Sequence, residues 1–382
     1  MTHLDRPVQT AVLGFLLAAV IVYLLTPVVT RIAHRAGVVD TPSDDRRMHL
    51  LATPLLGGLA IFFGLVISTL VLVRPLDRAT QGILVGGTII TLVGLIDDLF
   101  EIRPLLKFAG QLVAIGVAIA FDMRVTHMSL PFTSHIYWLP GWVSVIFTLV
   151  WVAAIINMVN FIDGLDGLAA GICAISALTF SVIALSMARS SMGIVAAILG
   201  GSTFAFLRFN FYPASIFMGD AGSMLLGFIL GVISVQSVMK STATVALVLP
   251  LLVLGVPFVD LFMIVWRRWR KGVPFYTSGQ DHMHHDLVLV VGLSQRRSVL
   301  LLYGWCLMLN GLAIAMRLNS VPAIAVLAVG AVVATAYMAQ LLSKYRSSSP
   351  GLDHERCDQR SADEPGAAGP AVNDHSDDDD RA

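Results

Sequence analysis

The chain alternates between long apolar stretches and short polar segments. Eleven apolar stretches approach the roughly 17 to 25 residues that a membrane-spanning helix needs. They cover residues 8–27, 54–73, 80–97, 105–121, 141–158, 165–187, 192–207, 216–238, 242–265, 298–316 and 321–343. Backbone in lipid must satisfy its own hydrogen bonds, so this pattern predicts an all-α integral membrane protein, a polytopic bundle of about 11 transmembrane helices.

The composition supports this class and excludes a soluble domain. Hydrophobic residues make up 56% of the 382 residues and charged residues 13%, which is roughly half the charged fraction of a soluble protein. The first apolar stretch is too long for a signal peptide and lacks a small-residue cleavage site, so we expect it to be retained. Cys173, Cys306 and Cys357 show neither a disulfide framework nor metal-ligand spacing.

The distribution of basic residues predicts the orientation. The spans divide the loops between the two sides of the membrane, and an odd number of spans puts the termini on opposite sides. One set of loops contains 15 Lys and Arg residues and the other contains seven. The positive-inside rule assigns the first set to the cytoplasm, with the N-terminus outside and the C-terminus inside. Residues 347–382 hold ten acidic and three basic residues, and we expect them to form a disordered acidic tail behind a transmembrane domain of residues 1–346.

Acidic residues carry separate information, because the positive-inside rule concerns Lys and Arg. Without the tail, the chain has 22 basic and 15 acidic residues, and 12 of these acidic residues fall on the predicted cytoplasmic side. The basic balance suits anionic lipid headgroups or phosphorylated substrates, and no nucleic-acid partner is expected. The clustering of the acids predicts one active site at the cytoplasmic face.

The first candidate motif is TLVGLIDDLFEIRPLLK, residues 91–107, in which an apolar run ends in Asp97, Asp98 and Glu101. Carboxylates at the C-terminal end of a helix are unfavourable unless a cation compensates them, and they are rare at a lipid boundary. Asp97 and Glu101 would share a face if the helix continued. Alternatively, these acids solvate the loop or cap the next helix, which Pro104 is expected to begin.

Two further motifs interrupt apolar runs with glycine and aspartate. NMVNFIDGLDGLAAG, residues 157–171, breaks the helical pattern twice and leaves Asn157, Asn160, Asp163 and Asp166 at the boundary. A plain turn needs one Asp-Gly pair, so the repetition favours function. In NFYPASIFMGDAGS, residues 210–223, Asp220 has two compatible interpretations: an N-cap, or a metal ligand beside helix N–H groups that attract phosphate.

The last motifs combine histidine and basic residues. GQDHMHHDL, residues 279–287, carries His282, His284 and His285. Three histidines within four residues suggest zinc, but no cysteine supports a closed tetrahedral site. They would equally suit phosphate contacts and proton handling, and an ordinary surface loop is the alternative. RRMHLLATPLLGG, residues 46–58, is either a phosphate-contacting segment or a membrane-surface anchor. Asp260 is interpreted as a structural charge partner for Arg267 and Arg268. Oxygen ligands predominate, which favours Mg²⁺ or Mn²⁺ and phosphoryl transfer.

Five of these stretches, ATPLLGG, GLIDDLFEIRP, NMVNFIDGLDGLAAG, NFYPASIFMGDAGS and DHMHHDL, stand in the order found in polyprenyl-phosphate N-acetylhexosamine-1-phosphate transferases. The chain resembles this family over about residues 45–297, and HMHH followed by GLSQRR is similar to the WecA/TagO branch and not to the MraY branch. The resemblance implies transfer of N-acetylglucosamine 1-phosphate from UDP-GlcNAc to undecaprenyl phosphate in the bacterial inner membrane. UMP would be released, and the lipid-linked product would start a cell-envelope polysaccharide of O-antigen, common-antigen or teichoic-acid type.

The resemblance also implies roles for individual residues. Asp220 would be the principal Mg²⁺ ligand, with Mn²⁺ as a substitute, and Asp97 and Asp98 would support the metal or accept a proton from the lipid phosphate. Asn160 and Asp163 would contact the pyrophosphate, and the uracil would be held by Asp166, Asn210 and Phe217. The phosphates or the sugar would be contacted by His282, His284 and His285, and further phosphate contacts would come from Arg46, Arg47 and His49. Asn157 would contact the substrate in general.

Alternatives stay open at this stage. Another UDP-HexNAc, such as one carrying FucNAc, QuiNAc or MurNAc-pentapeptide, would use the same motifs. An ion-coupled membrane transporter is a different class, but transporter acids usually lie mid-span in paired repeats. A scaffold for polymer-assembly partners would leave the five motifs unexplained. The resemblance allows a homodimer, and the sequence does not specify the oligomeric state.

Overall fold

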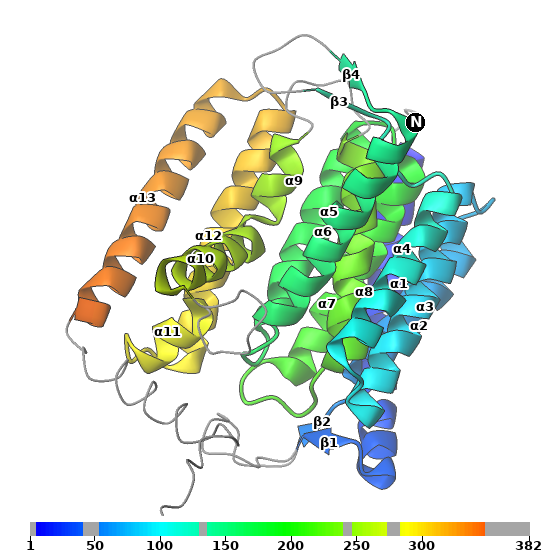
Figure 1. Cartoon of the computed structure of the whole chain (residues 1–382). Coiled ribbons are helices and arrows are strands. Elements are labelled where there is room, and N and C mark those ends of the chain that lie inside the picture. The colour runs from blue at the N-terminus through cyan, green and yellow to red at the C-terminus, as the bar shows by residue number, and fades with distance from the viewer. Residues whose placement is uncertain (1–4, 41–52, 130–135, 240–246, 273–282, 348–382) are drawn as a thin grey trace, which may run out of the picture.

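The computed structural model describes residues 5–40, 53–129, 136–239, 247–272 and 283–347, and these form a helical bundle (Figure 1). The first part contains α1 (Asp5–Ala36), α2 (Gly57–Leu72), α3 (Arg78–Phe100), α4 (Pro104–Ala120), α5 (Gly141–Ile162), α6 (Leu168–Ser186), α7 (Ser190–Asn210) and α8 (Gly219–Ile233), which a π-helical turn, η1 (Ser234–Met239), extends. The second part contains α9 (Val248–Val253), α10 (Gly255–Lys271), α11 (Met283–Leu289), α12 (Gln295–Arg317) and α13 (Val321–Ser347).

Strands are confined, in the described residues, to two short antiparallel pairs. One joins β1 (Val39–Asp40) to β2 (Thr53–Pro54), and the other joins β3 (His127–Ser129) to β4 (Ile136–Trp138). The two pairs lie at opposite ends of the bundle (Figure 1). The polar motifs of the sequence gather at the β1–β2 end.

The helices confirm an all-α polytopic membrane protein. Among the described residues, eight helices are long and apolar enough to cross a membrane, and α2 and α4 are shorter apolar helices. These ten helices coincide with ten of the eleven predicted spans. The predicted acidic tail lies, from residue 348 on, outside the described residues.

The ninth predicted span, residues 242–265, is not one continuous helix. The described part of it is divided into α9 and α10. Pro257 has no amide hydrogen to donate to the carbonyl of Val253, four residues earlier, so the helical ladder is interrupted there. Ser176 Oγ at 2.9 Å and Asn310 Nδ2 at 3.2 Å donate to this carbonyl instead. A run of apolar residues hides such a break because hydropathy does not register backbone hydrogen bonds.

Helix α8 lies at the centre of the bundle. In its most apolar stretch 83% of the residues are buried, against 11% in α13 at the edge. Glycines allow α2 and α3 to approach its first turn without intervening side chains. A Cβ on Gly58 would lie 2.2 Å from the amide nitrogen of Gly222, and a Cβ on Gly94 would lie 2.5 Å from that of Ala221. The start of α8 is therefore held by direct backbone contact with two neighbouring helices.

Candidate active site

The first turn of α8 is capped by a carboxylate from another helix. Asp98, near the end of α3, accepts hydrogen bonds from the backbone N–H groups of Asp220 at 2.7 Å and Ala221 at 3.0 Å. These N–H groups have no partner inside their own helix, and an anion at a helix N-terminus is favourable. Gly219 precedes them with φ +67°, a conformation that favours glycine. Asp98 thus holds the start of α8, whose second residue is Asp220.

Lys107 joins the two other carboxylates of this region. Its ammonium lies 2.9 Å from Asp97 Oδ2 and 2.5 Å from Asp220 Oδ2, and only 18% of its side chain is exposed. Asn160 Nδ2 donates to the other oxygen of Asp220 and, at 2.9 Å, to Ser223 Oγ. Asp97 Oδ1 also accepts the N–H of Ile102 at 2.9 Å. The compensating cation for these aspartates is a lysine of α4.

The Asp-Gly-Leu-Asp-Gly turn connects α5 to α6 and is tied to the loop before α8. Asp166 Oδ2 accepts the N–H of Ala214 at 2.8 Å. Asn210 Oδ1 accepts the N–H of Gly167 at 3.1 Å, and its Nδ2 donates to the carbonyl of Ile216 at 3.0 Å. Asp166 and Asn210, both predicted to contact uracil, therefore hold two motif loops together while also lining the cavity described next.

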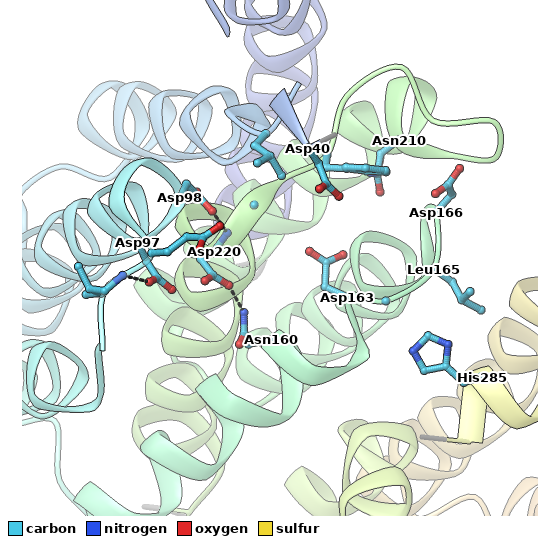
Figure 2. A pocket seen from close by; sticks show the side chains of 16 residues that line it. Asp40, Asp97, Asp98, Asn160, Asp163, Leu165, Asp166, Asn210, Asp220 and His285 are labelled. Atoms are coloured by element: carbon cyan, nitrogen blue, oxygen red, sulfur yellow. Dashed lines mark hydrogen bonds between the residues drawn. The ribbon is translucent and has the colours of Figure 1, made fainter. Parts of the chain in front are cut away.

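A cavity of about 740 Å³ opens among these elements at the β1–β2 end of the bundle (Figure 2). Its lining comes from motifs that are far apart in sequence and includes five aspartates besides Asp166: Asp40, Asp97, Asp98, Asp163 and Asp220. The rest of the lining is Leu55, Glu101, Ile102, Asn160, Gly164, Leu165, Asn210, Phe217, Gly219 and His285. The predicted convergence of the acidic motifs is thus present in the structure.

Asp163 is a cavity carboxylate whose surroundings disfavour its negative charge. It directly follows α5, and burial raises its pKa well above the usual range of an aspartate. The negative charges of Asp220 and Asp98 raise this pKa further. A proton or a bound cation at this point of the cavity would relieve the repulsion.

The histidine motif approaches the cavity from α11. His285 lines the cavity, and His284, 2% exposed, packs beside it with ring centroids 4.4 Å apart. Gly164 lies so close that a Cβ there would be 2.6 Å from His284 Nε2. The glycine in the turn after α5 is thus needed for contact with the histidines.

Asn157 does not line the cavity, Glu101 lines it from just beyond the end of α3, and four further predicted residues lie outside the described residues. Asn157 is not among the lining residues: its Nδ2 donates to Gln111 Oε1 at 2.8 Å and to the carbonyl of Ala153. Glu101 does not share a helical face with Asp97, because α3 ends at Phe100 and Glu101 has φ 47°. Four residues with predicted phosphate or sugar contacts lie outside the described residues: Arg46, Arg47, His49 and His282.

Sequence reasoning did not identify Lys107 or Asp40 as site residues. A signal for Lys107 exists, since it stands in the first turn of α4, where the helix dipole disfavours a cation. A lysine at this position is therefore expected to have an ion-pair partner outside its own helix. Asp40 reaches the cavity through the pairing of β1 with β2, with Asp40 opposite Thr53, and two-residue strands leave no readable periodicity.

The donor set suits a hard divalent cation. In the described residues, no three His, Cys, Asp or Glu side chains already converge as a metal-binding group. Mg²⁺, however, usually takes one or two carboxylates together with substrate phosphates. Asp97 and Asp220 already contact one cation in common, the Lys107 ammonium. The residues therefore fit Mg²⁺ in charge and in donor type.

Comparison with known proteins agrees with this geometry. Residues 80–238 match the model of the family described as "Glycosyl transferase family 4". The "Probable undecaprenyl-phosphate N-acetylglucosaminyl 1-phosphate transferase" of Bacillus subtilis (strain 168) is 36% identical over 300 residues, which cover 78% of this chain and 83% of that protein. The chain belongs to glycosyl transferase family 4. The membership predicted from the motifs is confirmed.

Further relatives are similar to this chain over comparable lengths. The "Decaprenyl-phosphate N-acetylglucosaminephosphotransferase" of Mycobacterium leprae (strain TN) is 35% identical over 328 residues, covering 78% of this chain and 82% of that protein. The "Phospho-N-acetylmuramoyl-pentapeptide-transferase" of Desulforudis audaxviator (strain MP104C) is 32% identical over 333 residues, covering 78% and 97%. The family region of this chain contains three of the five motifs and every aspartate of the cavity except Asp40.

Proposed function

We propose that this chain transfers N-acetylglucosamine 1-phosphate from UDP-GlcNAc to undecaprenyl phosphate, with release of UMP. The observation that carries the proposal is the cavity in which Asp97, Asp98, Asp163 and Asp220 meet beside Lys107 and His285. A cavity of this charge at one end of a membrane bundle suits a reaction between a water-soluble pyrophosphate and a lipid phosphate. The similarity to the Bacillus subtilis protein supports the choice of sugar and carrier.

Mg²⁺ is part of the proposal, with Asp220 and Asp97 as the residues that would hold it. When bound, Mg²⁺ neutralises negative charge on the pyrophosphate and so favours phosphoryl transfer. Asp98 would act through α8, because both of its oxygens accept N–H groups of that helix. Asn160 would keep Asp220 oriented through the hydrogen bond to its second oxygen.

The reaction itself needs little from a general base. An oxygen of the lipid phosphate forms a bond to the sugar-bearing phosphorus, while the bond from that phosphorus to the bridging oxygen of UMP breaks. UMP leaves with the electron pair, and a phosphate dianion attacks without prior deprotonation. The chain would orient the two substrates in line, with the Lys107 ammonium and the His285 ring beside the developing charge. Phe217, which lines the cavity, would stack on the uracil.

We further propose that the cavity faces the cytoplasm of a bacterial cell, because its end of the bundle carries the larger set of basic residues. A cytoplasmic opening would also meet the supply of nucleotide sugars. Donors with another UDP-HexNAc are the second candidate, supported by the similarity to the Desulforudis audaxviator protein.

The deciding experiment measures UMP release by the purified full-length chain with undecaprenyl phosphate and a panel of UDP-sugars. UDP-GlcNAc should support turnover, EDTA should abolish it, and added Mg²⁺ should restore it. Asp220→Asn should lower turnover by at least about 100-fold. The matched control is Asp122→Asn, at an exposed aspartate that pairs with Arg78 and has φ 64°, a conformation that asparagine tolerates.

Each result bears on a different part of the proposal. Turnover with UDP-MurNAc-pentapeptide and not with UDP-GlcNAc would overturn the donor alone. Full turnover by Asp220→Asn would overturn the role of the aspartate, and full turnover in EDTA would overturn the metal. Absence of UMP with every donor, from a correctly folded chain, would overturn the reaction class.

A further inference from the structure

Helix α10 has its polar side turned into the protein. Asp260, Arg267 and Arg268 are 2%, 8% and 7% exposed, whereas Phe262 and Trp269 on other faces are 69% and 77% exposed. A surface helix of a soluble protein shows the reverse arrangement. The buried charges of α10 must therefore have partners inside the protein, since an unpaired buried charge is strongly unfavourable.

The partners of two of these charges lie on α11. Asp260 Oδ1 accepts the N–H of Met283, the first residue of α11, at 2.7 Å. One turn later, Arg267 Nη1 donates to Asp286 Oδ2 at 2.7 Å, with side-chain exposures of 9% and 4%. Helix α11 is only seven residues long, which is too short for a helix to be stable by itself. Its position depends on such contacts.

Between these two contacts, α11 presents the histidines of the cavity. His284 and His285 follow Met283 directly and precede Asp286. His284 is 2% exposed and packs against Gly164, and His285 lines the cavity (Figure 2). Because Asp260 and Arg267 hold the residues on either side of the pair, a shift of α11 moves both rings.

We propose that Asp260 and Arg267 are positioning residues that place His284 and His285 at the cavity through α11. The proposal rests on the proposed function, in which the His285 ring lies beside the developing charge. It replaces the expectation that Asp260 is only a charge partner for the arginines of its own helix. A displacement of about 1 Å at a reacting centre is enough to lower a rate by about 100-fold.

The first test uses matched substitutions and a double-mutant cycle on UMP release. Asp260→Asn keeps an oxygen that accepts the N–H of Met283 and should retain turnover, whereas Asp260→Ala should lose about 100-fold. Arg267→Met should lose a similar factor, and Arg270→Met is the control, because Arg270 lies over Trp266 on the outer side of the same helix. Combined with His284→Ala and His285→Ala, Arg267→Met should add less than about twofold, since coupled residues are not additive. Losses that multiply would overturn the proposal.

The second test does not depend on activity. Carbethoxylation of His284, followed by mass spectrometry, should be slow in the wild-type chain and at least about 10-fold faster in Asp260→Ala and Arg267→Met, because local opening exposes a buried group. His34, which is exposed on α1, provides the internal reference rate. Unchanged labelling of His284 in both variants would overturn the proposal. If the wild-type chain transferred no sugar phosphate, the proposed function would fail, and the labelling would still decide whether Asp260 and Arg267 hold α11.

Discussion

At the scale of single residues, the carboxylates of the cavity have different roles because they make different contacts. Both oxygens of Asp98 accept backbone N–H groups, so this residue belongs to the framework of α8. Asp97 and Asp220 share the Lys107 ammonium. Asp163 has neither arrangement, and burial raises its pKa. The same side chain thus serves as a cap, as an ion-pair partner and as a titratable group.

Removing the charge of Lys107 should separate catalysis from metal affinity. Lys107→Met leaves Asp97 and Asp220 without their internal cation, so Mg²⁺ no longer competes with an ammonium for the same oxygens. The concentration of Mg²⁺ for half-maximal UMP release should fall, while the maximal rate should drop by about 100-fold. A titration of the rate with Mg²⁺ measures both quantities.

Arg78→Met is the control for this titration, because Arg78 pairs with Asp122 at an exposed position of the opposite end. An unchanged half-maximal Mg²⁺ concentration in Lys107→Met would contradict the competition.

Replacing Asp163 by asparagine should stabilise the protein in a pH-dependent way. The folded-state pKa of Asp163 is raised, chiefly by burial, so the folded chain binds a proton more tightly than the unfolded chain. Wild-type stability therefore decreases as pH rises from the unfolded pKa toward the folded one, and the full loss remains above it. Asp163→Asn lacks this loss.

The measurement is the thermal unfolding midpoint in detergent at several pH values. The midpoint of Asp163→Asn should exceed that of the wild type at pH 8, and the two should converge at pH 4. A difference that grew toward low pH would contradict the sign.

Local sequence pattern located most of these residues because acids at the ends of apolar runs are unusual. It did not locate Lys107, whose partner Asp220 is 113 residues away. The resemblance implied a substrate contact for Asn157, and in the structure that side chain is hydrogen-bonded to Gln111 on α4. Contacts between helices decide such cases, and no single motif contains them.

At the scale of elements, the break between α9 and α10 is stabilised from two other helices. Pro257 leaves the carbonyl of Val253 without a helical donor, and Ser176 of α6 and Asn310 of α12 supply donors instead. The ten other spans follow hydropathy well. This one differs because a proline inside an apolar run changes hydrogen bonding without changing hydropathy.

Removing both donors at the break should destabilise the fold. The double variant Ser176→Ala and Asn310→Ala leaves a buried carbonyl unsatisfied, which costs about 1–3 kcal/mol of unfolding free energy. Each single variant should cost less, because one donor remains. Thermal or denaturant unfolding in detergent measures the difference.

Thr88→Val is a suitable control, since its exposed hydroxyl donates to the carbonyl of Leu84 in its own helix. A double variant as stable as this control would show that the carbonyl finds another donor.

At the scale of the whole molecule, the acidic motifs of the described residues gather at one end of the bundle. The cavity lies at the end with β1 and β2, and the β3–β4 pair lies at the other (Figure 1). The sequence predicted this separation because the sidedness of acids and bases is a property of loops, which hydropathy delimits well. The division into a membrane domain and an acidic tail stays a prediction.

The proposed orientation can be read from cysteine labelling in intact cells. In a background with Cys357→Ser, the remaining native cysteines, Cys173 and Cys306, are buried. Ser320→Cys, between α12 and α13, should react with a membrane-impermeant maleimide, and Ser215→Cys, in the loop before α8, should react only after lysis. The opposite pattern would reverse the assignment of the two faces.

The backbone contacts at the start of α8 have a consequence for ion choice. Gly58 and Gly94 let the backbones of α2 and α3 touch the backbone of α8 directly. Because no side chains lie between these helices, the distance between the α3 backbone and that of Asp220 cannot change by side-chain rearrangement. A chelating group with fixed spacing discriminates between cations by radius. Under the proposed function, Ca²⁺, whose bonds to oxygen are about 2.3–2.6 Å against about 2.0–2.1 Å for Mg²⁺, should be a poor substitute, even though it carries the same charge.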